Sequence, residues 1–300
     1  MKYVDFPNSL ELIASKITPN KSRVINVANQ KGGVGKSTIV RLLPTILSML
    51  GFKCLVIDLD MQANATKSFF VTRNYLHEDE LTIFEKTLMK GIAEGSIKGL
   101  AIDITENLHF IPSAMDLESF PTFLSKKFGL VDIGDSNYYQ VKELQYEYFQ
   151  TLIDEVKSDY DFVFFDTPPS ASDFTKASSY VSDYVLIAFQ TQSDSLDGAV
   201  DYLGTTLTNL NNNMNTHFQV LGVLPNQYNN KKIDTTTIND AKNIFGEDNV
   251  FSNILPNITE IQNIPRDGLI NDSYWNARMY KMVAPVVEEF LTRIYLAEEE

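Results

Sequence analysis

The ten residues NQKGGVGKST, from Asn29 to Thr38, combine three glycines, two lysines and a Ser-Thr pair at a spacing suited to binding phosphate. Glycines let the backbone turn its N–H groups inward around phosphate oxygens. Lys36 would reach the β- and γ-phosphates of a nucleotide, the Ser37 hydroxyl would ligate Mg²⁺, and the Thr38 hydroxyl or amide would face the α-phosphate. The alternative is a glycine turn that merely links a strand to a helix, and it gives the Lys-Ser pair no packing role. The residues expected to bind the phosphates are Gly32, Gly33, Val34, Gly35, Lys36, Ser37 and Thr38.

A second lysine, Lys31, stands five residues before Lys36, next to Gln30 in the position where phosphate loops usually carry glycine. The segment KGGVGKS resembles the deviant Walker A loop of the ParA/MinD superfamily of ATPases. In that family the first lysine reaches across a dimer to the phosphates held by the other subunit. The resemblance implies a homodimer with ATP between its chains, in which Lys31 and Lys36 both contribute to catalysis. The alternative for Lys31 is an ordinary solvated loop residue.

Aspartates follow two further apolar runs. CLVIDLDMQANAT carries Asp58 and Asp60, and YDFVFFDTPPS carries Asp166. Because ligands of open α/β sheets bind at the carboxyl ends of the strands, we expect all three carboxylates near the phosphate loop. Mg²⁺ keeps several of its waters in proteins, and Asp166 would hold one of them. A second carboxylate can orient the water that attacks a phosphate.

The same two segments resemble the DxDPQGNAT and YDxIxIDxPPS segments of ParA proteins. The resemblance implies that Asp60 positions the hydrolytic water and that Asp58 supports the Mg²⁺ shell. The alternative for Asp58 is a hydrogen-bonded cap at the end of its strand. Met61 replaces the family's proline and Ala63 replaces its glycine, and we expect both changes to alter the stiffness of the loop more than its chemistry.

The resemblance covers most of the chain. LTIFEKTLMKG and NLHFIPSAMDLES resemble the family's middle segment, while VLGVLPNQYNNKK and VFSNILPNITEIQNIPRDGLI resemble the two segments that border the adenine. The second of these matches IPxNxxxxEAPxxG, with Asn263-Ile264 in place of Glu-Ala. The implied contacts to the base, some of them through the backbone, are Asn226, Pro256, Ile258 and Ile264.

Short apolar runs would form the strands that position these residues. Near-continuous apolar runs are typical of strands covered on both faces, and helical segments between them, such as 139–158 and 195–212, favour right-handed crossovers. The pattern predicts an α/β fold with a mostly parallel open sheet of about seven or eight strands and helices on both faces, as in P-loop NTPases. The predicted strands are 24–29, 54–60, 108–112, 161–166, 184–189, 219–225 and 250–255.

Residues 1–22 are predicted to be a short helical extension, and residues 23–300 a single ATPase domain. Asn8 or Ser9 would cap the helix of the extension, which would pack across the sheet or on a partner. Pro44 falls inside the helix predicted after the phosphate loop. Proline removes a backbone donor, so it should kink this helix or end it early.

The composition limits the partners of the chain. Its 300 residues carry a formal net charge of −14 with a pI of about 4.7, which argues against a general basic coat for nucleic acid but leaves room for a local basic patch. The lone cysteine, Cys54, excludes a disulfide framework and a cysteine metal cluster. No apolar stretch approaches the ~18 residues of a membrane span, and no signal peptide is visible, so we expect a soluble, cytoplasmic protein.

The chain end VVEEFLTRIYLAEEE is amphipathic but acidic, unlike the basic membrane-binding helix of MinD-like relatives. The iron–sulfur reductases of the superfamily need ligand cysteines, and its tyrosine autokinases carry clustered C-terminal tyrosines; this chain has neither. The resemblance therefore implies the DNA-partition type. Such a protein would be nucleoid-associated, would bind DNA without sequence preference as an ATP dimer, and would hydrolyse ATP slowly until a ParB-like centromere-binding partner stimulates it.

Non-specific DNA binding requires several cations on phosphates. Any one of the available cations could equally be a solvated surface residue.

The expected cofactors are ATP and Mg²⁺. Two alternatives stay open, a positioner of protein cargo from the same superfamily and a metabolic ATP-dependent ligase of the dethiobiotin synthetase type. The candidate DNA contacts are Lys231, Lys232, Lys242, Arg266, Arg278, Lys281 and Arg293.

Overall fold

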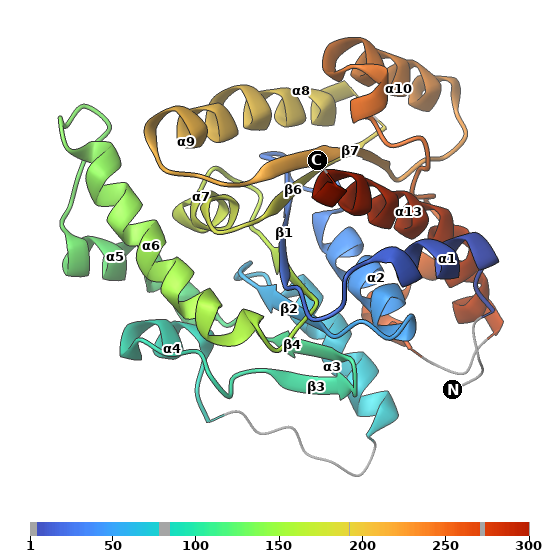
Figure 1. Cartoon of the computed structure of the whole chain (residues 1–300), viewed down its shortest axis with the longest axis horizontal. Coiled ribbons are helices and arrows are strands. Elements are labelled where there is room, and N and C mark those ends of the chain that lie inside the picture. The colour runs from blue at the N-terminus through green and yellow to red at the C-terminus, as the bar shows by residue number, and fades with distance from the viewer. Residues whose placement is uncertain (1–4, 78–84, 192, 271–273, 300) are drawn as a thin grey trace.

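The computed structural model describes residues 5–77, 85–191, 193–270 and 274–299. Within these residues seven strands form one sheet. The strands are β1 (Arg23–Ala28), β2 (Cys54–Asp58), β3 (Ile102–Thr105), β4 (Leu108–Ile111), β5 (Phe162–Asp166), β6 (Tyr184–Gln190) and β7 (Gln219–Asn226). Their order is β3-β4-β2-β5-β1-β6-β7, and every neighbouring pair is parallel except β3 and β4 (Figure 1). The predicted mostly parallel open sheet is confirmed.

Helices cover both faces of the sheet (Figure 1). One face carries α1 (Asn8–Lys16), α2 (Lys36–Met49), α3 (Asn64–Leu76), α11 (Thr259–Gln262), α12 (Ile264–Asp267) and α13 (Tyr274–Glu299). The other face carries α4 (Leu88–Glu94), the 3₁₀ turn η1 (Met115–Ser119), α5 (Phe120–Phe128), α6 (Tyr138–Lys157), α7 (Asp173–Tyr180), α8 (Ser193–Asp201), the π-helical segment η2 (Tyr202–Leu207), α9 (Thr208–Asn213) and α10 (Lys232–Phe245), which a second 3₁₀ turn, η3 (Glu247–Asn249), follows.

Alternation along the strands explains the two-sided core. Successive side chains of a strand point to opposite faces. In β2, Val56 packs with the cluster under α2 and α13, while Leu55 and Ile57 pack with the cluster under α6 and α7. Both faces are therefore apolar, and the sequence of the strand reads as a continuous apolar run.

The strand order brings the candidate site residues together at the carboxyl ends of neighbouring strands. The chain passes from β1 over β5 to β2, and from β5 back over β1 to β6, so the direction of winding reverses beside β1. In the parallel register Asp166 lies opposite both Val27 and Asp58. The loop after β1 and the ends of β2 and β5 therefore meet at the switch point, where open α/β sheets bind their ligands.

Two segments differ from the predicted strands. Residues 250–255 form no strand but only an isolated bridge between Val250 and Val223, with backbone bonds from Phe251 and Leu255 to β7 (2.9 and 3.1 Å). Their apolar pattern reflects packing against the core rather than a ladder. Strand β3 was not predicted, because this antiparallel edge strand is mostly half-exposed and shows no continuous apolar run.

Helix α2 contains Pro44 and still runs from Lys36 to Met49, so the expectation that proline ends the helix early is wrong. A proline inside a helix costs about 3 kcal/mol. Burial of a large apolar side chain stabilises by about 1.5–3 kcal/mol, and α2 buries several, among them Leu42, Leu43 and Leu47. Packing along the whole length of α2 therefore outweighs the lost hydrogen bond.

The predicted N-terminal helix exists as α1, and it packs on α13. Its cap position is Pro7 rather than Asn8 or Ser9, and the Ser9 hydroxyl instead donates to Glu288 of α13 at 2.7 Å. Leu10 contributes to the hydrophobic cluster that also contains α2 and α13. In the part of the chain that the structure describes, no helix has the length and apolar character that crossing a bilayer requires.

The start of β1 is joined to the end of α13. Arg23 is 1% exposed, and its guanidinium donates to the two carboxylate oxygens of Glu298 at 2.7 and 2.8 Å. It also donates to the carbonyl oxygens of Thr18 and Lys21. Bidentate arginine–carboxylate pairs are among the strongest hydrogen-bonded contacts in proteins. The acidic end of α13 is therefore fixed to the first strand of the sheet.

Candidate nucleotide-binding site

The phosphate loop follows β1 directly and opens α2. Gly33 and Gly35 have φ angles of 79° and 91°, in the left-handed region that glycine adopts without strain. A Cβ atom on Gly35 would lie 1.7 Å from Nδ2 of Asn226, so the end of β7 packs directly against the loop. A Cβ atom on Gly32 would lie 3.4 Å from Pro169, which follows β5. Only glycine fits at position 35 without moving a neighbour.

Lys36 is held inside the loop. Its side chain is 6% exposed, and Nζ donates to the carbonyl oxygens of Asn29 (3.1 Å) and Lys31 (3.2 Å). Burial lowers the pKa of Lys36, while the charges of Asp166 and Asp60 act in the opposite direction. The ammonium group therefore lies where phosphate oxygens could replace the two carbonyls.

Asn29 fixes the base of the loop, and sequence reasoning gave it no role. The side chain is fully buried; Oδ1 accepts from the Lys31 amide at 2.7 Å, and Nδ2 donates to the carbonyl oxygens of Ala188 and Ser195. A Cβ atom on Gly198 of α8 would lie 2.5 Å from Oδ1 of Asn29. The backbone of Lys31 is thus anchored, while the residue itself is exposed.

Asp166 supplies an unused acceptor beside the loop. Its carboxyl group is 0% exposed, Oδ1 accepts from the Ser37 hydroxyl at 3.1 Å, and Oδ2 has no hydrogen-bond partner among the described residues. Burial, followed by the charge of Asp58, raises the pKa of Asp166 to about 8. A buried orphan oxygen beside a serine hydroxyl fits Mg²⁺ or one of its waters, since Mg²⁺ prefers oxygen ligands. The residues present therefore fit a magnesium–nucleotide complex.

Asp58 is expected to support the metal shell, and both of its carboxylate oxygens already accept hydrogen bonds from the protein. Oδ1 accepts from the Asp60 amide at 3.0 Å, and Oδ2 accepts from the amide and the hydroxyl of Thr66 at 2.9 and 2.7 Å. Burial nevertheless raises the pKa of Asp58 to about 6. Both oxygens hold the loop between β2 and α3, as expected of a hydrogen-bonded cap of the strand, and the support of the Mg²⁺ shell by Asp58 stays a prediction.

Asp60 lies at the start of that loop, which we call the Asp60 loop (residues 59–63). Oδ1 accepts from the Gln62 amide at 3.0 Å, and the carbonyl oxygen of Asp60 accepts from the Ser113 hydroxyl at 2.7 Å. The side chain is 8% exposed, and its charge acts on Lys36. Ala63 ends the loop at φ 55°, a left-handed conformation that is uncommon for a residue with a side chain. The carboxylate is therefore fixed near the phosphate loop.

The end of β7 supports the loop from the predicted adenine side. Asn226 donates to the Val34 carbonyl at 3.0 Å, and Gln227, which sequence reasoning missed, donates to the Gly33 carbonyl at 2.6 Å. Gln227 has a φ angle of 59°, so the surrounding contacts hold it in a strained conformation. Asn226 thus contacts the loop itself.

The other predicted base contacts lie after α10. A parallel bridge joins Pro256 to Tyr228, just beyond the end of β7. Ile258 is partly buried against the core. Ile264 is 1% exposed and belongs to the hydrophobic core, so we correct its assignment as a side-chain contact.

The candidate DNA contacts are mostly engaged elsewhere. Arg293 donates to the carbonyl oxygens of Leu221 and Val250 and pairs with Glu289 at 2.9 Å, while its guanidinium lies 4.2 Å from the centre of the Phe251 ring. Arg293 is therefore a structural residue, which corrects its assignment. Three further candidates, Lys242, Arg266 and Arg278, pair with Glu247, Asp267 and Glu260.

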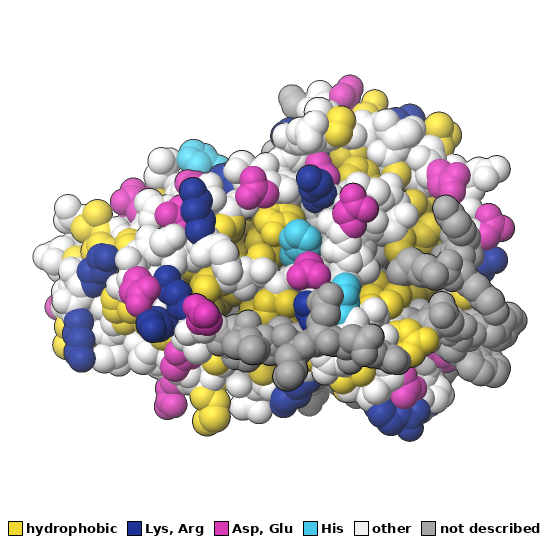
Figure 2. All heavy atoms as spheres, turned by 90° about the horizontal axis from the view of Figure 1, so that it is seen from below, with side chains coloured by type: hydrophobic (Ala, Val, Ile, Leu, Met, Phe, Trp, Pro, Cys, Tyr) yellow, Lys and Arg dark blue, Asp and Glu magenta, His cyan; other side chains and the backbone are white. Residues whose placement is uncertain are grey.

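Lys231, Lys232 and Lys281 are the exposed lysines of the predicted set. On the face shown in Figure 2, basic and acidic side chains are interspersed, and no continuous basic area is visible. The strong net negative charge is thus not offset by a basic surface on this face.

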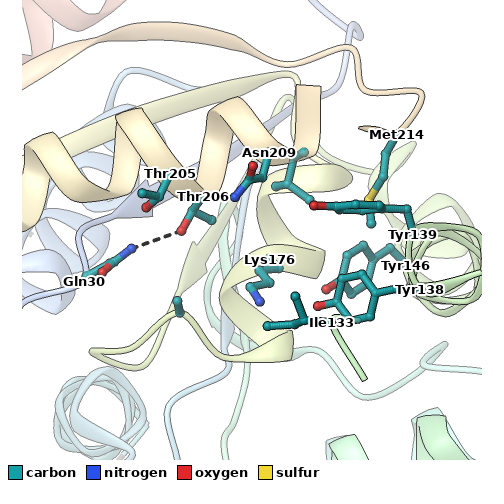
Figure 3. Close-up of a pocket in the computed structure, with 12 residues that line it drawn as sticks. Gln30, Ile133, Tyr138, Tyr139, Tyr146, Lys176, Thr205, Thr206, Asn209 and Met214 are labelled. Carbon is teal, nitrogen blue, oxygen red and sulfur yellow. Dashed lines mark hydrogen bonds between the residues drawn. The ribbon is translucent and has the colours of Figure 1, made fainter. Parts of the chain in front are cut away.

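A cavity of about 240 Å³ adjoins the phosphate loop on the side of α6 and α7. Figure 3 shows Tyr138, Tyr139 and Tyr146 of α6 on one side and residues of the π-helical segment on the other. Gln30 of the loop donates to the Thr206 hydroxyl at 3.1 Å. The sequence predicted one helix over 195–212. In the structure its middle part, Tyr202–Leu207, is π-helical and lies at this cavity. Short π-helical segments are frequent at functional sites.

Comparisons with known proteins agree with this geometry. Residues 22–220 match the AAA domain family. The chain is 28% identical over 261 residues to the chromosome-partitioning ATPase Soj of Treponema pallidum, and the alignment covers 85% of this chain and 93% of that protein.

Solved structures share the fold. McdA of Cyanothece, in a complex with ATP, superposes with a TM-score of 0.71 at 16% identity, over 92% of this chain and 98% of that one. A putative plasmid partition protein of Borrelia burgdorferi, bound to AMPPNP, gives a TM-score of 0.67 at 20% identity, over 89% and 98%. The family match covers residues 22–220, well over half of this chain. The chain therefore belongs to the AAA domain family, as a P-loop NTPase of the ParA partition type.

Proposed function

We propose that this chain is an ATP-switched partition ATPase. It binds ATP with Mg²⁺ at the phosphate loop and dimerises with the nucleotide between two copies. The dimer binds DNA without sequence preference, and a ParB-like centromere-binding partner stimulates slow hydrolysis, so that plasmid or chromosome copies are segregated. The observation that carries the proposal is the buried Asp166 carboxyl, with its unpartnered oxygen, beside Ser37 and the enclosed Lys36. The partition ATPase from Treponema pallidum supports the biological role.

Each residue has a separate task in this proposal. Lys36 exchanges its two carbonyl partners for oxygens of the β- and γ-phosphates. Ser37 and Asp166 hold Mg²⁺, which supplies charge neutralisation on the phosphates. Asp60, fixed by Gln62 and Ser113, orients the attacking water.

Lys31 works on the partner's nucleotide. Asn29 anchors its backbone while the residue stays exposed, so its ammonium group is available to a facing chain. An ATP held by one chain presents negative charge at its γ-phosphate, and a lysine from the other chain neutralises it. Loss of the γ-phosphate then weakens the dimer.

The test separates the two lysines. We expect Lys36→Ala to abolish ATP hydrolysis, and Lys31→Ala to abolish ATP-dependent dimers in sedimentation velocity while the monomer still binds nucleotide. Lys98→Ala, a change at an exposed residue away from the loop, is the matched control. Normal hydrolysis by the Lys36→Ala protein would end the proposal. Rapid turnover with a small metabolite, unaffected by DNA, would instead favour a metabolic ligase.

A further inference from the structure

A buried arginine lies one helical turn after the phosphate-loop hydroxyls and has no task in the proposal above. Arg41 of α2 is 6% exposed. Its Nε donates to the Ser37 carbonyl at 2.8 Å, Nη2 donates to the Thr38 hydroxyl oxygen at 3.2 Å, and Nη1 donates to the Ser68 hydroxyl oxygen of α3 at 2.7 Å. One guanidinium group therefore connects the first turn of α2 with α3.

The charge of Arg41 is costly where it lies. Burial lowers the pKa of Arg41, and the nearby Asp166 and Asp58 act in the opposite direction. Arginine stays protonated in proteins, and a buried charge destabilises the fold unless it is paired and hydrogen-bonded. Three hydrogen bonds and two neighbouring carboxyl groups meet that need, but an apolar side chain would fill the same space at lower cost.

The hydrogen-bond directions show what the arginine does for the loop. A hydroxyl group has one hydrogen to donate, and its oxygen can accept. Because the Thr38 oxygen accepts from Arg41, the Thr38 hydrogen is left to donate elsewhere, and Thr38 is the residue expected to face the α-phosphate.

The second connection leads to the Asp60 loop. Ser68 belongs to α3, which begins directly after that loop. Thr66, in the first turn of the same helix, holds Asp58 through its amide and its hydroxyl. Any displacement of α3 relative to α2 therefore moves the segment that carries Asp60.

We propose that Arg41 is a positioning residue for the nucleotide. It keeps the Thr38 hydroxyl oriented as a donor to the α-phosphate, and it fixes α3 with the Asp60 loop against the first turn of α2. It acts through Thr38 and Ser68 and does not touch the nucleotide. The inference rests on the proposed function, because it requires a nucleotide at the loop.

Arg41→Lys and Arg41→Gln test the first part. Lysine keeps the charge but loses the planar fork that serves three acceptors at once, and glutamine loses the charge. We expect both variants to bind ADP with Mg²⁺ about tenfold more weakly in titration calorimetry, as for one lost hydrogen bond to a charged group.

Arg73→Lys is the matched control. Arg73 is buried like Arg41, at 6% exposure, but it belongs to α3. It lies at the end of α3 that is remote from the loop, where its Nε donates to the Asp103 carbonyl at 2.9 Å. We expect this variant to lower the melting temperature and to bind ADP with Mg²⁺ within about twofold of the parent protein. A folded Arg41→Lys protein with the parent affinity for ADP would overturn the inference.

A double-mutant cycle separates positioning from general stability. If Arg41 acts through Thr38, Thr38→Val and Arg41→Lys should not add: the double variant should bind ADP no more than about twofold more weakly than the weaker single variant. Independent effects that multiply would contradict the proposed route. The two failures can be told apart, since a parent protein that binds no ADP contradicts the proposed function, and unchanged Arg41 variants contradict only this inference.

Ser68→Ala tests the second part and remains usable if both Arg41 variants fail to fold. It removes the α3 partner of the guanidinium, together with the bond that the Ser68 hydroxyl donates to the Asn64 carbonyl at 3.1 Å. We expect faster amide hydrogen exchange over residues 58–66 in the ADP complex, with the affinity for ADP within about twofold of the parent. Unchanged exchange over these residues would overturn the connection between Arg41 and the Asp60 loop.

Discussion

The buried side chain of Asp166 would link the proposed metal site to pH. Its folded-state pKa of about 8 lies well above the ~3.9 of an aspartate in an unfolded chain. Between these two values the folded protein holds a proton that the unfolded protein has lost. Stability of the ligand-free protein therefore falls as pH rises through this window, and Asp166 contributes no further loss above it.

To bind at the proposed site, Mg²⁺ must displace the proton of the Asp166 carboxyl group. We expect the affinity for ADP with Mg²⁺ to rise between pH 6 and pH 8.5, and binding at pH 7 to release protons, because the carboxylate form is the ligand. Calorimetry in two buffers of different ionisation enthalpy measures the proton release. Asp166→Asn, which carries no titrating proton, should reduce both effects, and what is left would come from other groups such as Asp58, whose pKa is raised to about 6. An affinity independent of pH, with no proton release, would contradict the role of Asp166.

The residues of the site divide by the range of their contacts. Gly33, Gly35 and Lys36 could be predicted because the loop is local: glycine spacing and the following helix lie within a few residues. Asn29 and Gln227 could not, because the carbonyl groups to which they donate are more than 100 residues away in the sequence. The buried charge of Arg41 was equally invisible, since its helix reads as apolar around it.

At the scale of elements, the Asp60 loop combines a tight anchor with a strained end. Asp58 holds its start, and Ala63 ends it at φ 55°. The left-handed conformation costs a residue with a side chain about 1–2 kcal/mol relative to the right-handed one, and glycine avoids this cost. The sequence predicted that alanine here changes the stiffness of the loop, and the φ angle gives a physical reason for that expectation.

Ala63→Gly should therefore relieve strain in the folded state while giving the unfolded chain more freedom. The second effect is worth about 0.4–1 kcal/mol, so we expect the free energy of unfolding to change by less than about 1 kcal/mol and the loop amides to exchange faster. Ala65→Gly, in the first turn of α3, is the control and should lose about 0.5–1 kcal/mol. If Ala63→Gly and Ala65→Gly lower the free energy of unfolding by the same amount in urea titrations, the result would argue against strain at Ala63.

Strands were predictable to the extent that both of their faces are buried. β2 and β5 read as continuous apolar runs because helices cover each side. The edge strand β3 gave no such run, and residues 250–255 gave one without forming a ladder. The π-helical segment was not predicted, and residues 195–212 were expected to form one regular helix.

At the scale of the whole molecule, the net negative charge opposes the proposed binding of DNA. The net charge is −14, and several candidate cations are paired with carboxylates. Binding without sequence preference depends on cations placed on phosphates, and it weakens as salt rises. Lys231 and Lys232 are exposed candidates that lie next to each other at the start of α10, and a dimer could bring the two pairs together.

We expect ATP-dependent mobility shifts of DNA at low salt that disappear steeply as salt rises. Replacing both Lys231 and Lys232 by alanine removes four lysines from the proposed dimer, so it should weaken binding and reduce the slope of log affinity against log salt by up to about four. The double change Lys90→Ala with Lys98→Ala, at exposed lysines outside the candidate set, is the control and should leave the slope unchanged. No shift with ATP at low salt would remove DNA from the proposed function.

The contact between Arg23 and Glu298 joins α13 to the first residue of β1. Arg23 opens the strand that leads straight into the phosphate loop, and Glu298 lies in the last turn of the final helix. Loss of this pair would release the end of α13 from the strand that leads into the proposed nucleotide site.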